Sequence, residues 1–369
     1  MSAEEAAADQ PGHIKPLTSL RFLAAIWVVL YHYWPHLQVG FTPGLVAKGY
    51  LGVELFFVLS GFILCHVYLR EAERGTFRWR GFIWARLARI YPLHLAVLVG
   101  VGLMGAAAAL AGVSVDPNLT DLHALPAHLT LTHAWGLSPV AGWNHPSWSI
   151  SAEWFAYLLF PAFAWLALKL KSRPWLAVSL ALLLIAGCYI GFQAATGQPL
   201  TRATIHWGAL RIVPCFFFGC AGYLLYRSGA LTNRRSATVI AAAAGAVILG
   251  LSELGAWDAI LVALFGALIV SLAAAWREGS SVMSRPTWVW LGEVSFAVYM
   301  VCIPWQQVYV NGAVRFLGLP EERLPLPLWI ALLAGVVPVA ALAHHLVEKP
   351  ARTAMRGFRG VRPFRAAAA

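Results

Sequence analysis

The chain has 369 residues, of which 60% are hydrophobic and only 12% are charged. Soluble globular proteins carry about 25% charged residues, so this composition all but excludes a water-soluble protein and predicts a polytopic membrane protein. The net charge of +11 usually suggests nucleic acid or another anionic partner, but in a membrane protein it is first a signal of topology.

The N-terminus and the cysteines carry little functional signal. Residues 1–16 are rich in alanine and acidic side chains, lack the apolar segment of a signal peptide, and are expected to be a disordered cytoplasmic segment. The five cysteines are odd in number, lie in apolar segments and form no Cys-x-x-Cys pair. We therefore expect neither a disulfide framework nor a zinc site.

About ten apolar segments are long enough to cross a bilayer as helices. They are 20–38, 51–69, 82–111, 148–168, 175–194, 206–226, 236–252, 257–275, 287–310 and 326–347. The predicted fold class is therefore an all-α polytopic bundle, with residues 17–350 as its transmembrane domain and 351–369 as a basic cytoplasmic tail. An even number of spans places both termini on one side.

Basic residues are distributed unevenly between the two sides. With a cytoplasmic N-terminus, the outer loops hold only Lys48, Arg202, Arg315 and Arg323, and Arg211 lies inside a span, whereas all other Lys and Arg residues fall on the inner side. The positive-inside rule therefore favours cytoplasmic termini. It also explains most of the positive charge without a nucleic-acid partner.

Arg21 and His32 share the first predicted span. Eleven residues are close to three helical turns, so both side chains point the same way, about 16 Å apart along the axis. Ionisable residues inside a membrane are costly and mark functional sites by default. A neutral imidazole in the position of His32 can accept a proton from a hydroxyl group as a general base; the alternative is a histidine that only pairs with a neighbouring helix.

The next two spans add an acid and a pair of arginines. Glu54 lies near the outer end of the second span and is either a solvated interfacial acid or part of a cavity. Arg86 and Arg89 open the third span and share one face. Two guanidinium groups there suit phosphate groups that arrive from the cytoplasm; the alternative is ordinary anchoring at the inner surface.

The fourth span opens with a cluster of polar and aromatic residues. Ser149 and Glu153 are neighbours one helical turn apart, and the Glu153 carboxyl is placed to orient a histidine or to bind a sugar hydroxyl. Trp148 is either an interfacial anchor or a surface for a sugar ring. In the sixth span, Arg211 is a candidate for stabilising an oxyanion or for pairing with an intramembrane acid.

The outer loop at about 112–147 contains four histidines. Three of them, His123, His128 and His133, are five residues apart, which does not place ligands on one helix face. No acidic residues at ligand spacing accompany them, so we expect no metal site.

Six motifs then occur in a fixed order along the spans. They are Arg21 with His32, GYLGVELFFVLSGFIL in the second span, RLARIYP at Arg86, PSWSISAEWFAY up to Tyr157, Arg211 with the following Phe216-Phe217-Phe218-Gly219, and Val347-Glu348-Lys349-Pro350. Together they resemble the acyltransferase-3 family of integral membrane O-acyltransferases, over residues 15 to 355. Glu54 stands where Asp is commoner in the family. Ile150, Ala152 and Trp154 also depart from its pattern and bear mainly on the acceptor.

The resemblance implies a bacterial inner-membrane enzyme that uses acyl-CoA, usually acetyl-CoA, as a donor substrate and has no permanently bound cofactor. The acceptor would be a glycan or polysaccharide outside the membrane. His32 would be the catalytic base, with Glu153 and Ser149 orienting it or the acceptor, and Arg21, Arg86 and Arg89 would bind the donor. Trp148, Glu54 and Arg211 would contribute to the substrate or oxyanion site.

Three alternatives remain open at this stage. A secondary transporter shares the ten spans and the intramembrane charges, although no internal symmetry is visible here. A membrane scaffold or sensor would use the polar residues only for packing. Within acyl transfer, the acceptor could instead be a lipid, peptidoglycan or a small molecule, and an acyl-enzyme on His32 could precede transfer.

Overall fold

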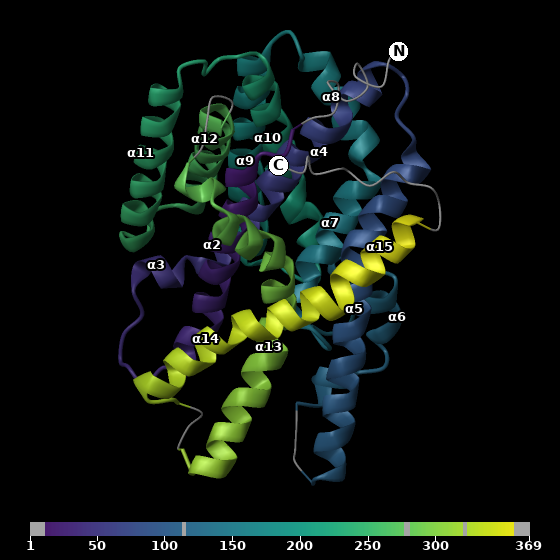
Figure 1. Cartoon of the computed structure of the whole chain (residues 1–369), viewed down its shortest axis with the longest axis vertical. Helices are drawn as coiled ribbons and strands as arrows, with labels where there is room; N and C mark the ends of the chain where they lie inside the picture. The colour runs from purple at the N-terminus through teal and green to yellow at the C-terminus, as the bar shows by residue number, and fades with distance from the viewer. Residues whose placement is uncertain (1–11, 113–115, 277–280, 320–322, 358–369) are drawn as a thin grey trace.

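The structure is a computed structural model that describes residues 12–112, 116–276, 281–319 and 323–357. These residues form helices and loops, and their β-structure is limited to one isolated bridge between Leu37 and Leu324. The all-α fold class predicted from the sequence is confirmed. Figure 1 shows most helices aligned along the long axis of the bundle, with the last helical stretch crossing its front obliquely.

Eight helices in the described residues are long and apolar enough to cross a membrane. They are α4 (Gly52–Glu73), α5 (Trp79–Leu110), α9 (Pro174–Thr196), α10 (Gly208–Arg227), α11 (Arg234–Glu253), α12 (Asp258–Trp276), α13 (Pro286–Leu317), and α14 (Leu326–Ala343) with its continuation α15 (Lys349–Gly357). Each coincides with one of the predicted spans. Residues 351–357 of the predicted tail are therefore helical, and the rest of that tail and residues 1–11 lie outside the described residues.

The fourth predicted span is broken in two. Helices α7 (Trp148–Leu158) and α8 (Phe160–Leu170) meet at an angle of 59° and count as one span only if the pair is taken together. Pro161 stands in the first turn of α8, where it cannot donate a backbone hydrogen bond to the preceding turn. The bend therefore directs α7, which carries Ser149 and Glu153, away from the line of α8.

The first predicted span is a helix but is less apolar than the others. Helix α2 (Lys15–Tyr33) is about 28 Å long but has a lower mean hydropathy than the eight helices above. It packs against α13 and α4, so its neighbours inside the bundle shield its polar residues from lipid. The prediction of about ten spans thus corresponds to eight apolar helices, one bent pair and this interior helix.

Close backbone contacts hold the interior helices together. A methyl group added at Gly61 of α4 would collide with the carbonyl oxygen of Phe216, and one added at Gly219 of α10 would collide with that of Val58. Gly292 of α13 approaches the carbonyl of Thr18 on α2 in the same way. Small residues at such crossings are typical of membrane helix pairs. The first two contacts join α4 to α10 and the third joins α13 to α2; because α4 also packs against α2, it lies between α10 and α2.

The peripheral helices show apolar faces to their surroundings. In the most apolar stretch of α9 and of α14, 22% of the residues are buried inside the protein, compared with 83% in α10. Large side chains such as Leu183, Val239 and Leu342 are more than half exposed. Apolar helices with such surfaces fit a bilayer, and the protein is a multi-pass membrane protein.

The segment between α5 and α7 is ordered where the structure describes it, from residue 116 onward. It forms the short helix α6 (Leu125–Leu129) and several single turns. The Ser151 hydroxyl of α7 donates to the carbonyl of Leu131 at 2.8 Å and accepts from the amide of Ala134 at 2.9 Å. The predicted outer loop is therefore pinned to the start of α7.

Candidate active site

A cavity of about 1500 Å³ opens between α2, α4, α5, α7, α13 and the α14–α15 stretch. Its wall follows α4 from Val53 to Glu71, which corresponds to about 27 Å of helix axis. It is therefore long enough to hold an extended ligand. Of the site residues predicted from the sequence, it brings together Arg21, Arg86, Arg89, Ser149 and Glu153.

One end of this cavity is strongly basic. Five further Lys and Arg residues line it, against three acidic ones. The basic residues are Arg78, Arg80, Lys349, Arg352 and Arg356, and the acidic ones are Glu71, Glu153 and Glu293. We call the end of the bundle that carries Arg78 and Arg80 the basic end. A cavity lined by an excess of one charge attracts ligands of the opposite charge.

The three arginines predicted for the donor differ in how they are held. The Arg86 guanidinium lies 5.7 Å from the centre of the Tyr68 ring and donates to the Tyr68 hydroxyl at 3.4 Å, but its Nε is buried without a partner. The side chains of Arg21 and Arg89 make no hydrogen bond or ion pair to any described residue. These donors are therefore left available to a ligand in the cavity.

Glu153 lies on the cavity wall and is bound by two hydroxyl groups. Ser60 of α4 donates to one carboxylate oxygen and Tyr157 of α7 to the other, each at 2.7 Å. Ser149, one turn earlier, donates to the carbonyl of Pro146 at 3.2 Å. The sequence did not single out Ser60 or Tyr157, although Tyr157 follows Glu153 at the spacing of one helical turn and Ser60 belongs to the second-span motif.

His32 lies just beyond the opposite end of the cavity. It is half-buried in the last turn of α2, 6.5 Å from His145 between ring centres, and is not part of the cavity wall. The Pro146 carbonyl that follows His145 accepts hydrogen bonds from both Ser149 and Tyr299, which do line the cavity. His145 and Pro146 thus connect His32 to residues of the cavity wall, and no hydrogen bond joins Glu153 to His32 in the described residues.

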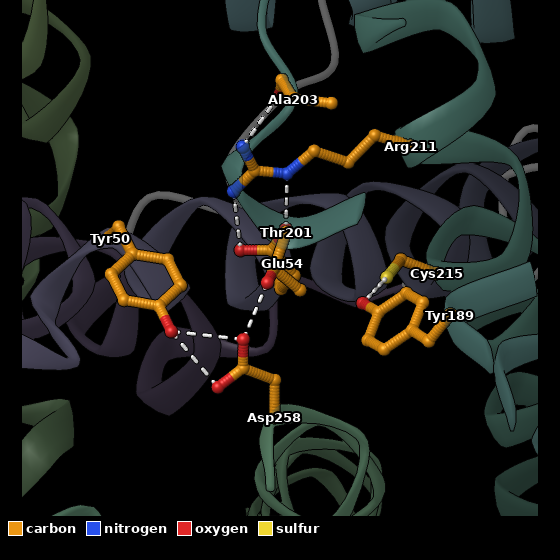
Figure 2. A network of polar contacts seen from close by, with 8 residues as sticks. All are labelled: Tyr50, Glu54, Tyr189, Thr201, Ala203, Arg211, Cys215 and Asp258. Atoms are coloured by element: carbon orange, nitrogen blue, oxygen red, sulfur yellow. Dashed lines mark hydrogen bonds and ion pairs between the residues drawn. The ribbon is translucent and has the colours of Figure 1, made fainter. Parts of the chain in front are cut away.

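Glu54, Arg211 and Trp148 form a separate buried cluster, and Figure 2 shows Glu54 and Arg211. Arg211 donates from Nε and Nη2 to the two carboxylate oxygens of Glu54, at 2.5 and 2.9 Å, and from Nη1 to the carbonyl of Ala203 at 2.8 Å. Its guanidinium lies 4.5 Å from the centre of the Trp148 ring. None of the three residues lines the cavity. Arg211 thus makes the ion pair that was one of its two predicted alternatives, and its role in the chemistry stays a prediction.

A neighbouring polar network was not predicted from the sequence. The carboxylate of Asp258 accepts hydrogen bonds from Lys48 at 2.6 Å, from Tyr50 and from Thr201 (Figure 2 shows the last two). Asp258 begins α12 and Lys48 precedes α4, so this network ties two helix ends together. The sequence offered two signals for this pairing: a carboxylate in the first turn of an apolar helix and a lone lysine in an outer loop.

The histidines form no metal site in the described residues. The His128 and His133 rings stack at 4.0 Å between centres, and His133 lies parallel to His94 of α5 at 6.0 Å. Stacked rings do not converge on a common ion. No group of three or more His, Cys, Asp or Glu side chains that could hold a metal ion occurs where the structure describes the chain.

Two further acids, Glu293 and Glu348, lie at or near the cavity. Glu348 is buried and accepts hydrogen bonds from His344 at 2.8 Å and from Arg352 at 3.4 Å. Glu293 of α13 lines the cavity. The sequence left the roles of both acids undecided.

Comparison with known proteins agrees with this arrangement. The family model described as an acyltransferase domain matches residues 15–345. The chain is 31% identical to acyltransferase MdmB of Streptomyces mycarofaciens, over 90% of each protein. It is 23% identical to the peptidoglycan O-acetyltransferase OatA of Listeria monocytogenes, over 92% of this chain and 56% of that protein. It is 24% identical to the putative peptidoglycan O-acetyltransferase YrhL of Bacillus subtilis, over 94% and 56%.

No solved structure matches the chain. The family model spans nearly all of the helices that build the cavity, from the start of α2 to the end of α14. The chain belongs to the acyltransferase-3 family and is a membrane acyltransferase.

Proposed function

We propose that this protein moves an acyl group, with acetyl as the expected one, from cytoplasmic acyl-CoA to a hydroxyl of a glycan outside a bacterial inner membrane. The observation that carries the proposal is the long cavity with unpaired arginines at its basic end. Relatives named O-acetyltransferases support the acetyl group. Family membership argues against a transporter or a scaffold.

The donor fits the cavity by charge and by shape. CoA carries its phosphates at one end and its thioester at the end of a flexible arm. Arginine forks suit phosphate oxygens, so Arg21, Arg86 and Arg89 would bind the phosphate end. The arm would then extend along α4 towards Ser149 at the start of α7 and Tyr299 in the middle of α13, which both line the cavity.

His32 would act from beyond the end of the cavity that Ser149 and Tyr299 line. Its imidazole would take the proton from an acceptor hydroxyl, the hydroxyl oxygen would attack the thioester carbonyl, and the carbon–sulfur bond would break. The departing thiolate would recover the proton, leaving acylated acceptor and free CoA. An acyl-enzyme on His32 is the alternative route. The acceptor hydroxyl would bind between His32 and the cavity, beside His145 and Pro146.

The acceptor is the least constrained part of the proposal. The relatives named peptidoglycan O-acetyltransferases favour a glycan, with a lipid or a small molecule as the alternative. Inverted membrane vesicles that contain the protein and enclose glycan fragments should transfer label from acetyl-CoA, added outside, to the enclosed fragments. Label that stays as acetyl-CoA, or that crosses the membrane without covalent transfer, would contradict the proposal.

Replacing Arg89 with alanine should weaken donor binding more than chemistry. A charge-assisted hydrogen bond contributes about 1.5–3 kcal/mol, so we expect the KM for acetyl-CoA to rise by about 10-fold or more with a smaller change in kcat. The measurement is initial-rate kinetics in inverted vesicles. The control is Arg173→Ala, since Arg173 is exposed in the turn before α9 and outside the cavity. An unchanged KM in the Arg89 variant would remove this residue from the donor site.

A further inference from the structure

The last helix of the bundle presents a basic stripe to the cavity. Lys349, Arg352 and Arg356 of α15 are spaced so that they share one helix face, and all three line the cavity. Figure 1 shows α15 crossing the front of the bundle beside α5. Arg86 and Arg89 of α5 line the same cavity.

Specific contacts hold α15 in this position. The indole of Trp84, two residues before Arg86, donates to the carbonyl of Met355 at 2.7 Å. At the other end, Arg352 donates to the buried Glu348 at 3.4 Å. Helix α15 is therefore fixed against α5 at the basic end and is not a loose tail. Its arginines are close enough to those of α5 for their charges to interact.

This arrangement is unfavourable without a ligand. Arg86 and Arg89 repel both Arg352 and Arg356, and only Arg352 of the stripe has an acidic partner among the described residues. The Nε atoms of both Arg86 and Arg356 are buried and have no hydrogen-bond partner. Buried donors are normally satisfied, and leaving a charged one unpaired is costly. Two neighbouring sets of guanidinium groups that line one cavity, with free donors, indicate a site for an anion with more than one phosphate.

We infer that α15 forms the second wall of the donor site and that Arg352 and Arg356 bind the terminal 3′-phosphate of the nucleotide end of CoA. The inference rests on the proposed function. Met355, beside Arg356, is bound by Trp84 near the start of α5, so the stripe ends at the basic end, where the nucleotide end would remain. Arg86 and Arg89 follow Trp84 further along α5 and would bind the diphosphate.

Donors with and without the 3′-phosphate test this assignment. Acetyl-CoA and acetyl-3′-dephospho-CoA are compared in wild type, in the double variant Arg352→Ala/Arg356→Ala and in Arg356→Lys. The wild type should have a KM at least 10-fold lower for acetyl-CoA. The double variant should lose this preference, through a KM for acetyl-CoA that is about 10- to 100-fold higher, and should use the dephospho donor nearly as wild type does. Arg356→Lys should keep part of the preference, because lysine retains the charge without the fork.

Arg235→Ala is the matched control, because Arg235 is exposed on α11 and lies outside the cavity. Binding of adenosine 3′,5′-bisphosphate to detergent-purified protein provides a second measurement that needs no turnover. Wild-type protein that transfers from both donors with equal KM would overturn the role of α15 and leave the proposed function standing. Protein that binds the bisphosphate through Arg352 and Arg356 but transfers no acyl group would overturn the proposed function instead. A double variant that binds the bisphosphate as tightly as wild type would also overturn the inference.

Discussion

A His32→Ala variant should transfer acyl groups at least 100-fold more slowly than the wild type while the protein is produced and inserted normally. General-base catalysis raises reaction rates by about 10²- to 10⁴-fold. His32 is the only histidine of α2, and its ring lies beside that of His145. The side chain makes no hydrogen bond to any described residue, so its loss leaves no partner unsatisfied. We therefore expect a catalytic defect without a folding defect.

Transfer from acetyl-CoA in inverted vesicles measures this effect, with protein amount and thermal stability recorded for each variant. His123→Ala is the matched control, because His123 is a solvent-exposed histidine whose side chain pairs with Asp121. Transfer at the wild-type rate in the His32 variant would contradict the mechanism. Acid quenching before acceptor is added separates the two routes: label that stays on the protein in the wild type but not in the variant indicates an acyl-enzyme on His32.

Breaking the ion pair between Glu54 and Arg211 should destabilise the protein by about 3–5 kcal/mol, because removal of one partner leaves the other as an unpaired buried charge. The two side chains are 0% and 2% exposed. Either Glu54→Met or Arg211→Met alone should lower the unfolding temperature in detergent and reduce the amount of inserted protein. The double variant should recover most of the loss, since an apolar pair of similar volume is often neutral.

Glu73→Gln is the control for the ion pair. Glu73 pairs with Lys171 and Arg227, but all three side chains are at least 27% exposed, and exposed pairs contribute at most about 1 kcal/mol. Acyl transfer by the double variant distinguishes the two roles considered for Arg211. Near-normal transfer by a folded double variant fits the ion pair seen in the structure, whereas a folded and inactive double variant would assign Arg211 to the chemistry.

The individual helices followed from local properties of the sequence. Low charge and long apolar segments predict membrane helices, because every segment that crosses a bilayer must itself be long enough, apolar and poor in charge. The shared helix face of Arg86 and Arg89 was also predictable from local sequence, because it depends only on their spacing. The bend at Leu159 was missed, because a segment that is apolar on both sides of Pro161 has the same composition whether straight or broken.

The partners of the polar residues were decided only by tertiary structure. Glu54 and Arg211 are 157 residues apart in sequence, and Ser60 and Glu153 are 93 apart. Nothing local indicates which intramembrane acid meets which base. The sequence determined that this is an all-α membrane protein with the motifs of an acyltransferase. Helix packing decided that the arginines of α5 face those of α15 across one cavity and that His32 lies beyond its end, because such contacts depend on how distant helices cross.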